Sequence, residues 1–364
     1  MKKIFFVLPT LQGGGAENVI SQLVLNLDKK KYDISVIVFD LSKQIYLKNK
    51  NIKIINLRSK KISSGVYRFL KVINSHKPNL LISTVSHLNL YISILKIFFP
   101  KKTKIIVRES NFLTQNIKLQ SRPYITKILY KIFYNNADVS LVFSKEHKID
   151  ILNNTNIKKN KIKIINNPID FNLIKKQSKK KILGKYKKFF KKKNIIKFIY
   201  VGSLSYQKGL DVLIKSLSYL DKSKFTLNII GQGSERGKLK KLVFQKKLNN
   251  NINFLPYLAN PFPLIKSSDI YMMFSRFEGM SNIVLEVLAL DKPIIFLNNI
   301  GASTELLKKV SSCYLINSNE PENISRKINS LNLKKKIFSN KELLKKFDIK
   351  ITTKKFENII DDIV

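Results

Sequence analysis

Two glutamates at a fixed spacing are the residues of this sequence that most suggest a binding site for a polar ligand. Glu278 and Glu286 stand eight residues apart, at the two ends of Glu-Gly-Met-Ser-Asn-Ile-Val-Leu-Glu. Because Glu286 falls inside an apolar helical pattern over 284–288, its carboxylate needs a polar partner. Sugar hydroxyls would provide one, and a salt bridge to a lysine at the edge of the core is the alternative. The helix N-terminus at 281–283 would offer free backbone N–H groups to an anion.

A lysine after a glycine turn could supply positive charge to the same ligand. Gly202-Ser203-Leu204-Ser205-Tyr206-Gln207-Lys208-Gly209 directly follows an apolar run. Lys208 would therefore enter a helix N-terminus at the carboxyl end of a strand, where open parallel sheets bind their ligands. An ammonium group at that place is a suitable counter-charge for a diphosphate. The alternative is that Lys208 is one more surface lysine in a very basic protein.

Two further glycine-rich turns also follow apolar runs. Gly13-Gly14-Gly15 would let backbone N–H groups approach a phosphate, with the next helix aimed at it. It is neither the dinucleotide fingerprint, because Asn18 replaces the third glycine, nor a P-loop, because no Gly-Lys-Ser/Thr follows. Gly231-Gln232-Gly233 would permit close approach to a flat base or a ribose. A plain strand-to-helix turn is the alternative for both segments.

Polar residues after two more apolar runs suggest a second binding surface. His87 follows the run 80–85, where it could contact an acceptor or a reacting hydroxyl. Arg108, Glu109 and Asn111 follow the next run, so they would lie at the same edge of a parallel sheet. These residues suggest an acceptor cleft. The alternatives are an ordinary loop residue for His87 and a local ion pair within the loop for the charged residues.

The elements that must position these residues alternate regularly along the chain. We predict buried strands at 4–8, 34–39, 52–57, 80–85, 104–107, 139–143, 162–165, 195–201, 225–230, 252–255, 270–274, 294–297 and 313–316. Helical periodicity is found at 16–27, 66–75, 123–135, 209–220, 234–247, 282–289, 322–328 and 342–363. Alternation of this kind predicts an α/β protein with parallel sheets and helices on both faces.

The length of 364 residues suits two domains. Asn166-Asn167-Pro168 is a turn signal between the two series of strands. The segment 175–197 that follows carries twelve lysines and no acidic residue. We therefore predict two doubly wound domains joined near residues 168–194 by a solvated lysine-rich segment.

The net charge of +44 is spread along the chain, with +21 on residues 1–170 and +23 on residues 171–364. AT-rich codons would explain much of the excess, since lysine, isoleucine and asparagine are all abundant. Attraction to an anionic membrane surface or to nucleic acid is the functional explanation. We favour the membrane, because no nucleic-acid-binding motif is recognisable and the charge is not concentrated on one element.

Several classes of protein are excluded or disfavoured by composition. A hydrophobic fraction of 44% is enough for a sizeable core, which excludes disorder. The single cysteine, Cys313, excludes an intramolecular disulfide and is expected in the core, and three scattered histidines make a metal cluster implausible. We expect no signal peptide and no membrane span, since the apolar window 80–99 is interrupted by polar residues from Ser83 to Lys96. A reducing, cytoplasmic setting fits.

The motifs together resemble those of the retaining glycosyltransferases of family 4. The resemblance covers nearly the whole chain, and its most specific element is the pair Glu278 and Glu286. Within the family, the sequence is most similar to bacterial enzymes that build lipid-linked or surface oligosaccharides, including lipopolysaccharide. The segments that carry the likeness are Gly13 to Glu17, Gly202 to Gly209, Gly231 to Gly233 and Glu278 to Glu286.

The resemblance implies a GT-B fold, in which two Rossmann-like domains hold the acceptor and the nucleotide-sugar. Residues 1–170 would form the acceptor domain and 171–345 the donor domain, with 171–194 as linker. The last helix, 346–364, would cross back to the first domain. The enzyme would act on the inner face of the cytoplasmic membrane, without a cofactor or a metal; no D-x-D triplet occurs in the sequence.

Roles for individual residues also follow from the resemblance. Glu286 would bind the ribose hydroxyls, and Glu278 would contact the donor sugar near the reacting carbon. Lys208 and the N–H groups after Ser281 would hold the diphosphate as charge builds on the leaving group. His87 would be a second catalytic residue and matches its position less securely. The remaining donor contacts would come from Gly14, Gly15, Ser203, Gly231, Gly233, Ser281, Asn282, Ile283 and Val284.

Two departures from the family pattern bear on activity. Ser203 stands where the family usually has arginine, so one counter-charge for the diphosphate is lost or comes from elsewhere, such as Arg276 or another lysine. Asp291 replaces a glycine usual after the helix of Glu286. We expect a UDP-sugar donor and a lipid-linked saccharide acceptor. The alternatives are an inactive GT-B subunit, a different two-domain α/β enzyme such as a nucleotide-sugar epimerase, and a basic nucleic-acid-binding protein.

Overall fold

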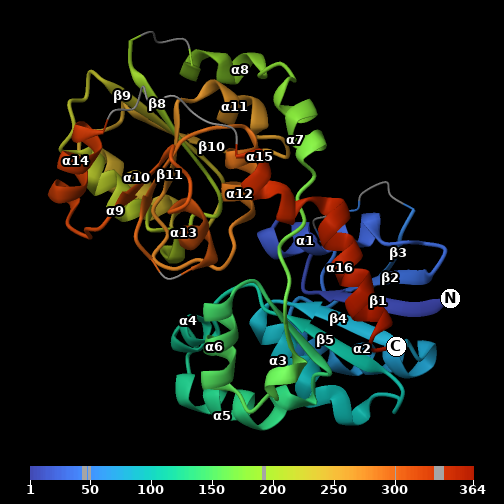
Figure 1. The fold of residues 1–364 in the computed structure, drawn as a ribbon. Helices are drawn as coiled ribbons and strands as arrows, with labels where there is room; N and C mark the ends of the chain where they lie inside the picture. Colours follow the sequence, from blue (N-terminus) through green and yellow to red (C-terminus); the bar gives the residue numbers. More distant parts are fainter. Residues whose placement is uncertain (43–46, 48–50, 191–193, 300, 332–339) are drawn as a thin grey trace. The chain divides into compact units, whose positions relative to one another are not determined.

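The computed structural model describes residues 1–42, 47, 51–190, 194–299, 301–331 and 340–364. The chain divides into two units, each built on its own parallel sheet (Figure 1). Unit 1 comprises Met1–Ile169 and Lys346–Val364, and unit 2 comprises Asp170–Lys345. Within these residues, no helix is both long enough and apolar enough to cross a membrane.

Unit 1 is built around a seven-stranded sheet in the order β3-β2-β1-β4-β5-β6-β7, and every pairing is parallel. Its strands are β1 Lys2–Leu8, β2 Tyr32–Val38, β3 Lys53–Asn56, β4 Leu80–Thr84, β5 Lys104–Arg108, β6 Val139–Val142 and β7 Ile162–Ile164. Its helices are α1 Gly15–Asn26, α2 Ile62–His76, α3 Ser86–Leu95, α4 Leu113–Lys118, α5 Pro123–Phe133, α6 Lys145–Asn154 and α16 Ile349–Asp361, with short 3-10 turns at Lys96–Phe98, Tyr134–Asn136 and Lys159–Lys161.

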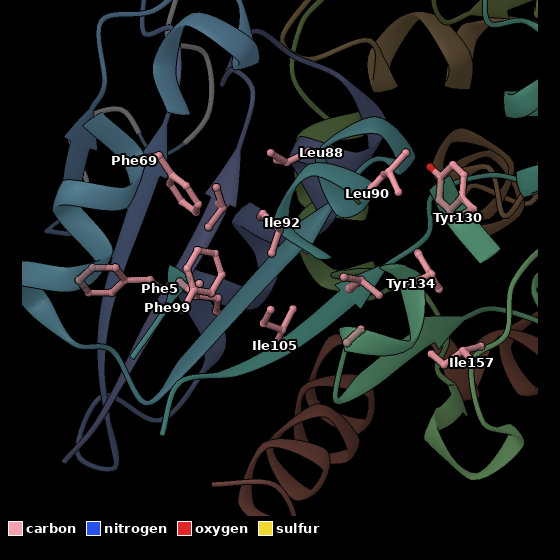
Figure 2. Close-up of a cluster of buried hydrophobic side chains, with 14 of the residues drawn as sticks. Phe5, Phe69, Leu88, Leu90, Ile92, Phe99, Ile105, Tyr130, Tyr134 and Ile157 are labelled. Carbon is pink, nitrogen blue, oxygen red and sulfur yellow. The ribbon is translucent and has the colours of Figure 1, made fainter. Parts of the chain in front are cut away.

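The apolar run of β1 is buried on both sides because helices cover both faces of the sheet. Phe5 and Val7 point into one core, and the alternate residues Ile4, Phe6 and Leu8 point into the other. Figure 2 shows the first core, where Phe5 lies near Phe69 of α2 and Phe99. The Phe69 and Phe99 rings meet edge to face, with their centroids 5.9 Å apart. These two cores fix the sheet whose carboxyl edge carries the polar residues.

The C-terminal helix α16 belongs to unit 1. Phe356 and Ile360 of α16 are buried in the second core of that unit. Polar contacts add to this packing, since Glu357 accepts a 3.0 Å hydrogen bond from the backbone N–H of Asp28. We expected one helix over 342–363, but α15 Lys341–Leu344 and the 3-10 turn Lys345–Phe347 precede α16. The helix restarts at Asp348, whose extended backbone and capping carboxylate begin α16.

Unit 2 has a six-stranded parallel sheet in the order β10-β9-β8-β11-β12-β13. Its strands are β8 Ile196–Val201, β9 Phe225–Ile230, β10 Ile252–Leu255, β11 Ile270–Met273, β12 Ile294–Leu297 and β13 Cys313–Ile316. Its helices are α7 Phe171–Ser178, α8 Gly184–Lys187, α9 Leu210–Leu217, α10 Arg236–Gln245, α11 Phe262–Ser267, α12 Asn282–Ala289, α13 Ala302–Leu307, α14 Pro321–Ser330 and α15, with 3-10 turns at Lys188–Phe190 and Tyr206–Lys208.

The lysine-rich segment is more ordered than the solvated linker we expected. Its first part folds as α7, which packs against α11 and α12 of unit 2. Ile174 is buried there, and Gln177 accepts hydrogen bonds from the side chain of Asn260. Lys175 and Lys176 are exposed on this docked helix. Residues 191–193, which also fall in the expected linker, lie outside the described part of the chain.

In each sheet, the order in which the strands follow one another reverses at one pair of neighbouring strands. In unit 1 the order reverses between β1 and β4, and in unit 2 between β8 and β11. In open α/β sheets, the carboxyl ends of such a pair diverge and leave a crevice where ligands bind. The fold therefore singles out the residues after β1, β4, β8 and β11.

Candidate active site

The strand reversal in unit 2 brings together two of the residues that the sequence singled out. Lys208 lies in the turn after β8, and Glu278 lies in the loop after β11. The Nζ atom of Lys208 donates to Oε2 of Glu278 in an ion pair. Only 17% of the lysine side chain and 11% of the glutamate side chain are exposed, so the pair is largely shielded from water. The two groups separated by seventy residues in sequence form one charged centre.

Two hydrogen bonds and a close backbone approach hold the loop that carries Glu278 in place. Ser275 Oγ donates to Glu278 Oε2 at 3.1 Å, and Gln207 Nε2 donates to the carbonyl of Phe277 at 3.0 Å. Gly301 lies against the same loop, where an added Cβ would sit 1.9 Å from the carbonyl oxygen of Glu278. The carboxylate is therefore fixed by its surroundings before any ligand arrives.

Glu286 differs from Glu278 in having no partner. It lies on α12 with its side chain half-buried, and within the described residues no donor hydrogen-bonds to its carboxylate. Burial raises the pKa of Glu286 to about 7, because the charged form is poorly hydrated there. None of the lysines that the structure describes forms the salt bridge to Glu286 that we considered as the alternative. A desolvated carboxylate without a donor is a group that can accept hydrogen bonds from a ligand.

The N-terminus of α12 is partly used by the protein itself. The backbone N–H of Ser281 donates to Ser303 Oγ at 2.8 Å, so the expectation that this N–H is free is wrong. Ile283 and Val284 lie in the first turn, where backbone N–H groups have no acceptor within the helix. Asn282 begins the helix between them and Ser281. The positive end of α12 therefore remains on the same loop as Glu278.

The glycines after β8 and β9 are explained by the approach of two backbones. An added Cβ on Gly231 would lie 1.9 Å from the carbonyl oxygen of Gly202, and one on Gly233 would lie 2.2 Å from that of Leu204. Leu204 N–H also donates to the carbonyl of Gln232 at 2.8 Å. This backbone packing is enough to require glycine at positions 231 and 233, as expected if the segment is a plain strand-to-helix turn. Contacts of Gly231 and Gly233 with a donor stay a prediction.

The structure also shows how the position of Ser203 is surrounded. Its carbonyl accepts a 2.9 Å hydrogen bond from the Tyr200 hydroxyl, and its own hydroxyl is near that of Ser205. Arg276, which we considered as a replacement charge, forms two hydrogen bonds of 2.7 and 2.9 Å to the carboxylate of Asp211. Its guanidinium also lies 4.1 Å from the centre of the Tyr206 ring. Arg276 is thus committed to Asp211, whose hydrogen bond raises the pKa of the guanidinium.

A hollow of about 440 Å³ lies beside the Glu278 loop in unit 2. Ser275 and Arg276 line it together with Asn298 and Asn299, which follow β12. Asn299 is fixed in place, because its Nδ2 donates to the carbonyl of Ser275 at 2.6 Å and its Oδ1 accepts from Thr304. The Glu278 loop therefore has open, amide-lined space on the side of Ser275 and Arg276.

The glycine turn of unit 1 already holds an anionic group. Glu17, in the first turn of α1, accepts 2.9 Å hydrogen bonds from the backbone N–H groups of Gly13 and Gly14 and also contacts Thr10. These N–H groups are among those we expected to face a phosphate. Sequence reasoning assigned no role to Glu17, although a glutamate at the third position of a helix is the signal for a capping box. Gly15 begins the helix itself.

A buried carboxylate underlies the loop of His87. Glu109 has no exposed surface, and its oxygens accept hydrogen bonds from Ser86 at 2.5 Å and from Asn89 and Tyr134 at 2.7 Å. Burial raises the pKa of Glu109, against the effect of these donors. The local ion pair with Arg108 is absent from these contacts. Glu109 is therefore placed to fix the turn of Ser86 rather than to touch an acceptor.

The turn that Glu109 holds is strained at Val85. This β-branched residue has a φ of 71°, a conformation that is unfavourable for its side chain. His87 follows in the first turn of α3 and is exposed at the carboxyl end of β4. Neighbouring atoms still desolvate the imidazole enough to lower the pKa of His87, which favours its neutral form. A fixed turn at this place would hold the His87 side chain toward a substrate.

The remaining predicted acceptor residues have different surroundings. Arg108 is almost fully buried and donates to Asn167 at 2.6 Å and to Thr84 at 3.3 Å, with burial lowering its pKa to about 10. Asn111 is half-buried, and its side-chain oxygen accepts from the N–H of Phe112 at 3.0 Å. Sequence reasoning did not point to His147, a fully buried imidazole next to Phe143. Burial lowers the pKa of His147 to about 3.

Comparison with known proteins matches this arrangement to one family. Residues 13–173 match Glycosyltransferase Family 4, and residues 173–349 match the family described as glycosyl transferases group 1. The chain belongs to the glycosyltransferases. The site in unit 2 lies in the part of the glycosyltransferase that matches group 1, and the residues after β1, β4 and β5 lie in the part that matches family 4.

Related sequences agree with this assignment. Two uncharacterized glycosyltransferases of Methanocaldococcus jannaschii are 31% identical over 65% of this chain and 30% identical over 74% of it. The matches cover 59% of the first relative's own length and 70% of the second's. A Campylobacter jejuni protein named as an α-1,4-N-acetyl-D-galactosaminyltransferase acting on a GalNAc-containing saccharide linked to PP-undecaprenol is 24% identical, and the match covers 96% of this chain and 95% of the relative.

Solved structures confirm the predicted GT-B fold. The crystal structure of Anabaena HepE in complex with UDP and glucose superimposes with a TM-score of 0.80. Its sequence is 16% identical, and the match covers 99% of this chain and 100% of that protein. WaaG, described as a glycosyltransferase involved in lipopolysaccharide biosynthesis, gives a TM-score of 0.73 at 13% identity, over 98% of this chain and 99% of WaaG.

Proposed function

We propose that this glycosyltransferase is a retaining enzyme that moves a hexose or an N-acetylhexosamine from a UDP-sugar to a lipid-linked saccharide. The observation that carries the proposal is the cluster at the strand reversal of unit 2. There a paired glutamate, an unpaired glutamate and a lysine occupy neighbouring segments, next to a helix N-terminus. Such a cluster can bind a ligand that has hydroxyls, a diphosphate and a sugar.

In this proposal the unpartnered carboxylate of Glu286 accepts hydrogen bonds from the ribose hydroxyls. The diphosphate takes its counter-charge from Lys208 and from the first-turn N–H groups of α12, at Asn282, Ile283 and Val284. These fixed donors stabilise the charge that develops on the leaving group, so they lower the barrier without a metal ion. The absence of a D-x-D triplet from the sequence is in keeping with this metal-independent chemistry.

Binding of the donor would rearrange the ion pair of the unliganded site. Lys208 would exchange its contact with Glu278 for the diphosphate, which carries more negative charge. Glu278 would then be free to meet the donor sugar near its reacting carbon, while Ser275 continues to hold one of its oxygens. In unit 1, the exposed His87 and the half-buried Asn111, which follows β5, are the proposed acceptor side. Arg108 ends β5 and is almost fully buried, so it would support this side rather than touch the acceptor.

The identities of the donor and the acceptor rest on what the relatives are named for. The Anabaena structure contains UDP and glucose, which supports a UDP-sugar. The Campylobacter relative is named for an acceptor linked to PP-undecaprenol, which supports a saccharide on a polyprenyl diphosphate. An acceptor of this kind would bring the enzyme to the inner face of the cytoplasmic membrane, where the chain's charge of +44 would favour anionic lipid.

Calorimetric titration with UDP, GDP and ADP tests the proposal. We expect UDP to bind best, and Glu286→Ala to lower its affinity about 30- to 150-fold, since hydrogen bonds to a charged group contribute roughly 2 to 3 kcal/mol. Glu322→Ala is the matched control, because it removes an exposed carboxylate on α14 that pairs with Arg326. The control should bind UDP as the unmodified protein does.

Three results would contradict the proposal in different ways. Equal UDP affinity in Glu286→Ala would remove the ribose role, and no binding of any nucleotide by folded protein would support the inactive-subunit alternative. Turnover with an α-linked UDP-sugar then tests the stereochemistry. A product with a β-linkage, seen from the anomeric proton coupling by NMR, would overturn the retaining mechanism.

A further inference from the structure

Helix α5 of unit 1 exposes apolar side chains where a surface helix normally has polar ones. Tyr124, Ile125, Ile128 and Ile132 are 78%, 48%, 39% and 59% exposed. Tyr124, Ile128 and Ile132 are spaced by four residues, so they follow one another along a single face. Together with Leu119, which precedes the helix and is 59% exposed, these residues are called the α5 face below.

The exposure of the α5 face is not a consequence of a loosely packed helix. On the opposite side, Tyr130 is 2% exposed and donates a 2.6 Å hydrogen bond to the carbonyl of Ser86. Leu129 packs against the first core of unit 1. Helix α5 also packs against α3 and α4. The helix is therefore anchored by one side, and its other side displays apolar groups to the surroundings.

Basic residues border the α5 face without any acidic neighbour along the chain. Lys127 and Lys131 are exposed on the same turns as the apolar residues, and Lys118 and Arg122 are exposed just before the helix. The sequence from 110 to 137 contains four basic residues and no aspartate or glutamate. No ion pair is recorded for any of the four within the part of the chain that the structure describes. Their charge is therefore available to an outside partner.

We infer that the α5 face is the surface by which unit 1 docks on an anionic lipid bilayer. A helix that lies in the plane of a bilayer inserts an apolar, aromatic-containing face while its lysines and arginines meet the lipid phosphates. The α5 face has both features on one anchored helix. The inference deepens the proposed function, on which it rests, because a lipid-linked acceptor is presented at such a surface.

Charge complementarity decides between this occupant and a second copy of the chain. A symmetric contact between two α5 faces would bring Lys127 and Lys131 of one copy against the same residues of the other. Like charges at such a contact are unfavourable, whereas anionic lipid neutralises them. A bilayer also accommodates a single convex helix without a complementary groove.

The test compares co-sedimentation with vesicles of phosphatidylcholine alone and with vesicles containing 30% phosphatidylglycerol. We expect binding to the anionic vesicles only, and weaker binding at higher salt. Lys127→Gln with Lys131→Gln should lower the partition coefficient about 25-fold, at about fivefold per lysine. Ile128→Ser with Ile132→Ser should lower it by about tenfold or more through lost apolar insertion.

A control variant separates the α5 face from general surface charge. Phe244→Ser with Lys240→Gln and Lys241→Gln removes one exposed aromatic residue and two exposed lysines from α10 of unit 2. We expect this control to bind vesicles as the unmodified protein does. Equal losses in the control and in the α5 variants would overturn the inference in favour of diffuse attraction. Because the altered side chains are exposed, each variant should keep its circular dichroism spectrum and its UDP affinity.

The outcomes also distinguish the inference from the proposed function. Unmodified protein that binds UDP but no anionic vesicle would overturn the α5 surface and leave the donor site intact. Protein that binds vesicles through α5 but no nucleotide would do the reverse. A dimer in solution that dissociates in the Ile128→Ser, Ile132→Ser variant would show that a second copy covers this face instead.

Discussion

At the scale of single residues, the protonation of Glu286 should control nucleotide binding. Burial raises the pKa of this carboxyl to about 7, and ribose hydroxyls donate to the ionised form. Binding of UDP should therefore weaken as the pH falls below about 7, approaching a tenfold loss per pH unit. Calorimetry from pH 8 to pH 5.5 measures this, and Glu286→Gln shows which part of the trend belongs to the phosphates of UDP.

The sign of the effect on stability is opposite. A carboxyl whose pKa is higher in the folded protein binds more protons when folded, so this group stabilises the fold more as the pH falls from 7 toward its ordinary value. Low pH should thus favour the empty site and disfavour the occupied one. A UDP affinity that stays constant relative to the glutamine variant would show that Glu286 does not accept hydrogen bonds from the nucleotide.

Residue types and spacing singled out three groups of unit 2, but not their partners. Glu278, Glu286 and Lys208 were selected because their positions follow predicted strands or interrupt an apolar helix, and their roles in binding stay predictions. The pairing of Lys208 with Glu278 could not be predicted, since it depends on which strands are neighbours in the sheet. Arg276 illustrates the same limit, because its commitment to Asp211 is made between segments sixty-five residues apart.

In unit 1 the same limit prevented us from predicting the contacts of two acidic residues, Glu17 and Glu109. Glu17 was visible only as part of the glycine motif, and its capture of two N–H groups follows from the helix that begins at Gly15. Glu109 was expected at an acceptor cleft, but its three donors come from α3 and the turn after α5. Distant donors of this kind leave no local signal in a sequence.

At the scale of elements, the turns after β8 and β9 pack so closely that a side chain in place of Gly233 should destabilise the protein. An added Cβ would lie 2.2 Å from the carbonyl oxygen of Leu204, and the obstacle is backbone rather than a flexible side chain. Gly233→Ala should therefore lower the free energy of unfolding by about 1 to 3 kcal/mol, the range for overpacking. Urea unfolding followed by circular dichroism measures the change.

Gly237 provides the matched control, because it lies two residues into α10 and an added Cβ meets nothing within 4 Å. Gly237→Ala should raise stability by about 0.5 to 1 kcal/mol, through higher helix propensity. Equal effects of the two substitutions would show that the close approach at Gly233 is not rigid.

Strands were easier to predict than helix ends. Every predicted strand is present, because each is a short apolar run bounded by turn residues, for example β9 between Lys224 and Gly231. The interruption before α16 was missed, since the lysine-rich pattern of 341–361 continues through it without proline or glycine. Helix α7 was missed for a related reason, because its lysines concealed the few apolar residues, such as Ile174, by which it docks.

At the scale of the whole molecule, the C-terminal helix α16 should stabilise unit 1, which contains the N-terminus of the chain, and not unit 2, which directly precedes the helix in sequence. Phe356 of α16 is 1% exposed and stacks on Phe6 of β1 with ring centroids 6.5 Å apart. Phe356→Ala should therefore destabilise unit 1 by about 3 to 5 kcal/mol, the cost of a large cavity in a core. Hydrogen exchange should report it as lost protection of the amides of β1 and β4, with those of β8 and β11 unchanged.

Leu344→Ala is the reciprocal variant, because Leu344 lies on α15 in unit 2 and is 3% exposed. It should lower protection in unit 2 alone, by about 2 to 5 kcal/mol. Two residues twelve positions apart would then report on different units, as the division of the chain at Lys345 requires. If both substitutions lowered protection across both sheets equally, the units would unfold as one cooperative body, and the proposed donor site in unit 2 would lose affinity for UDP when unit 1 is weakened.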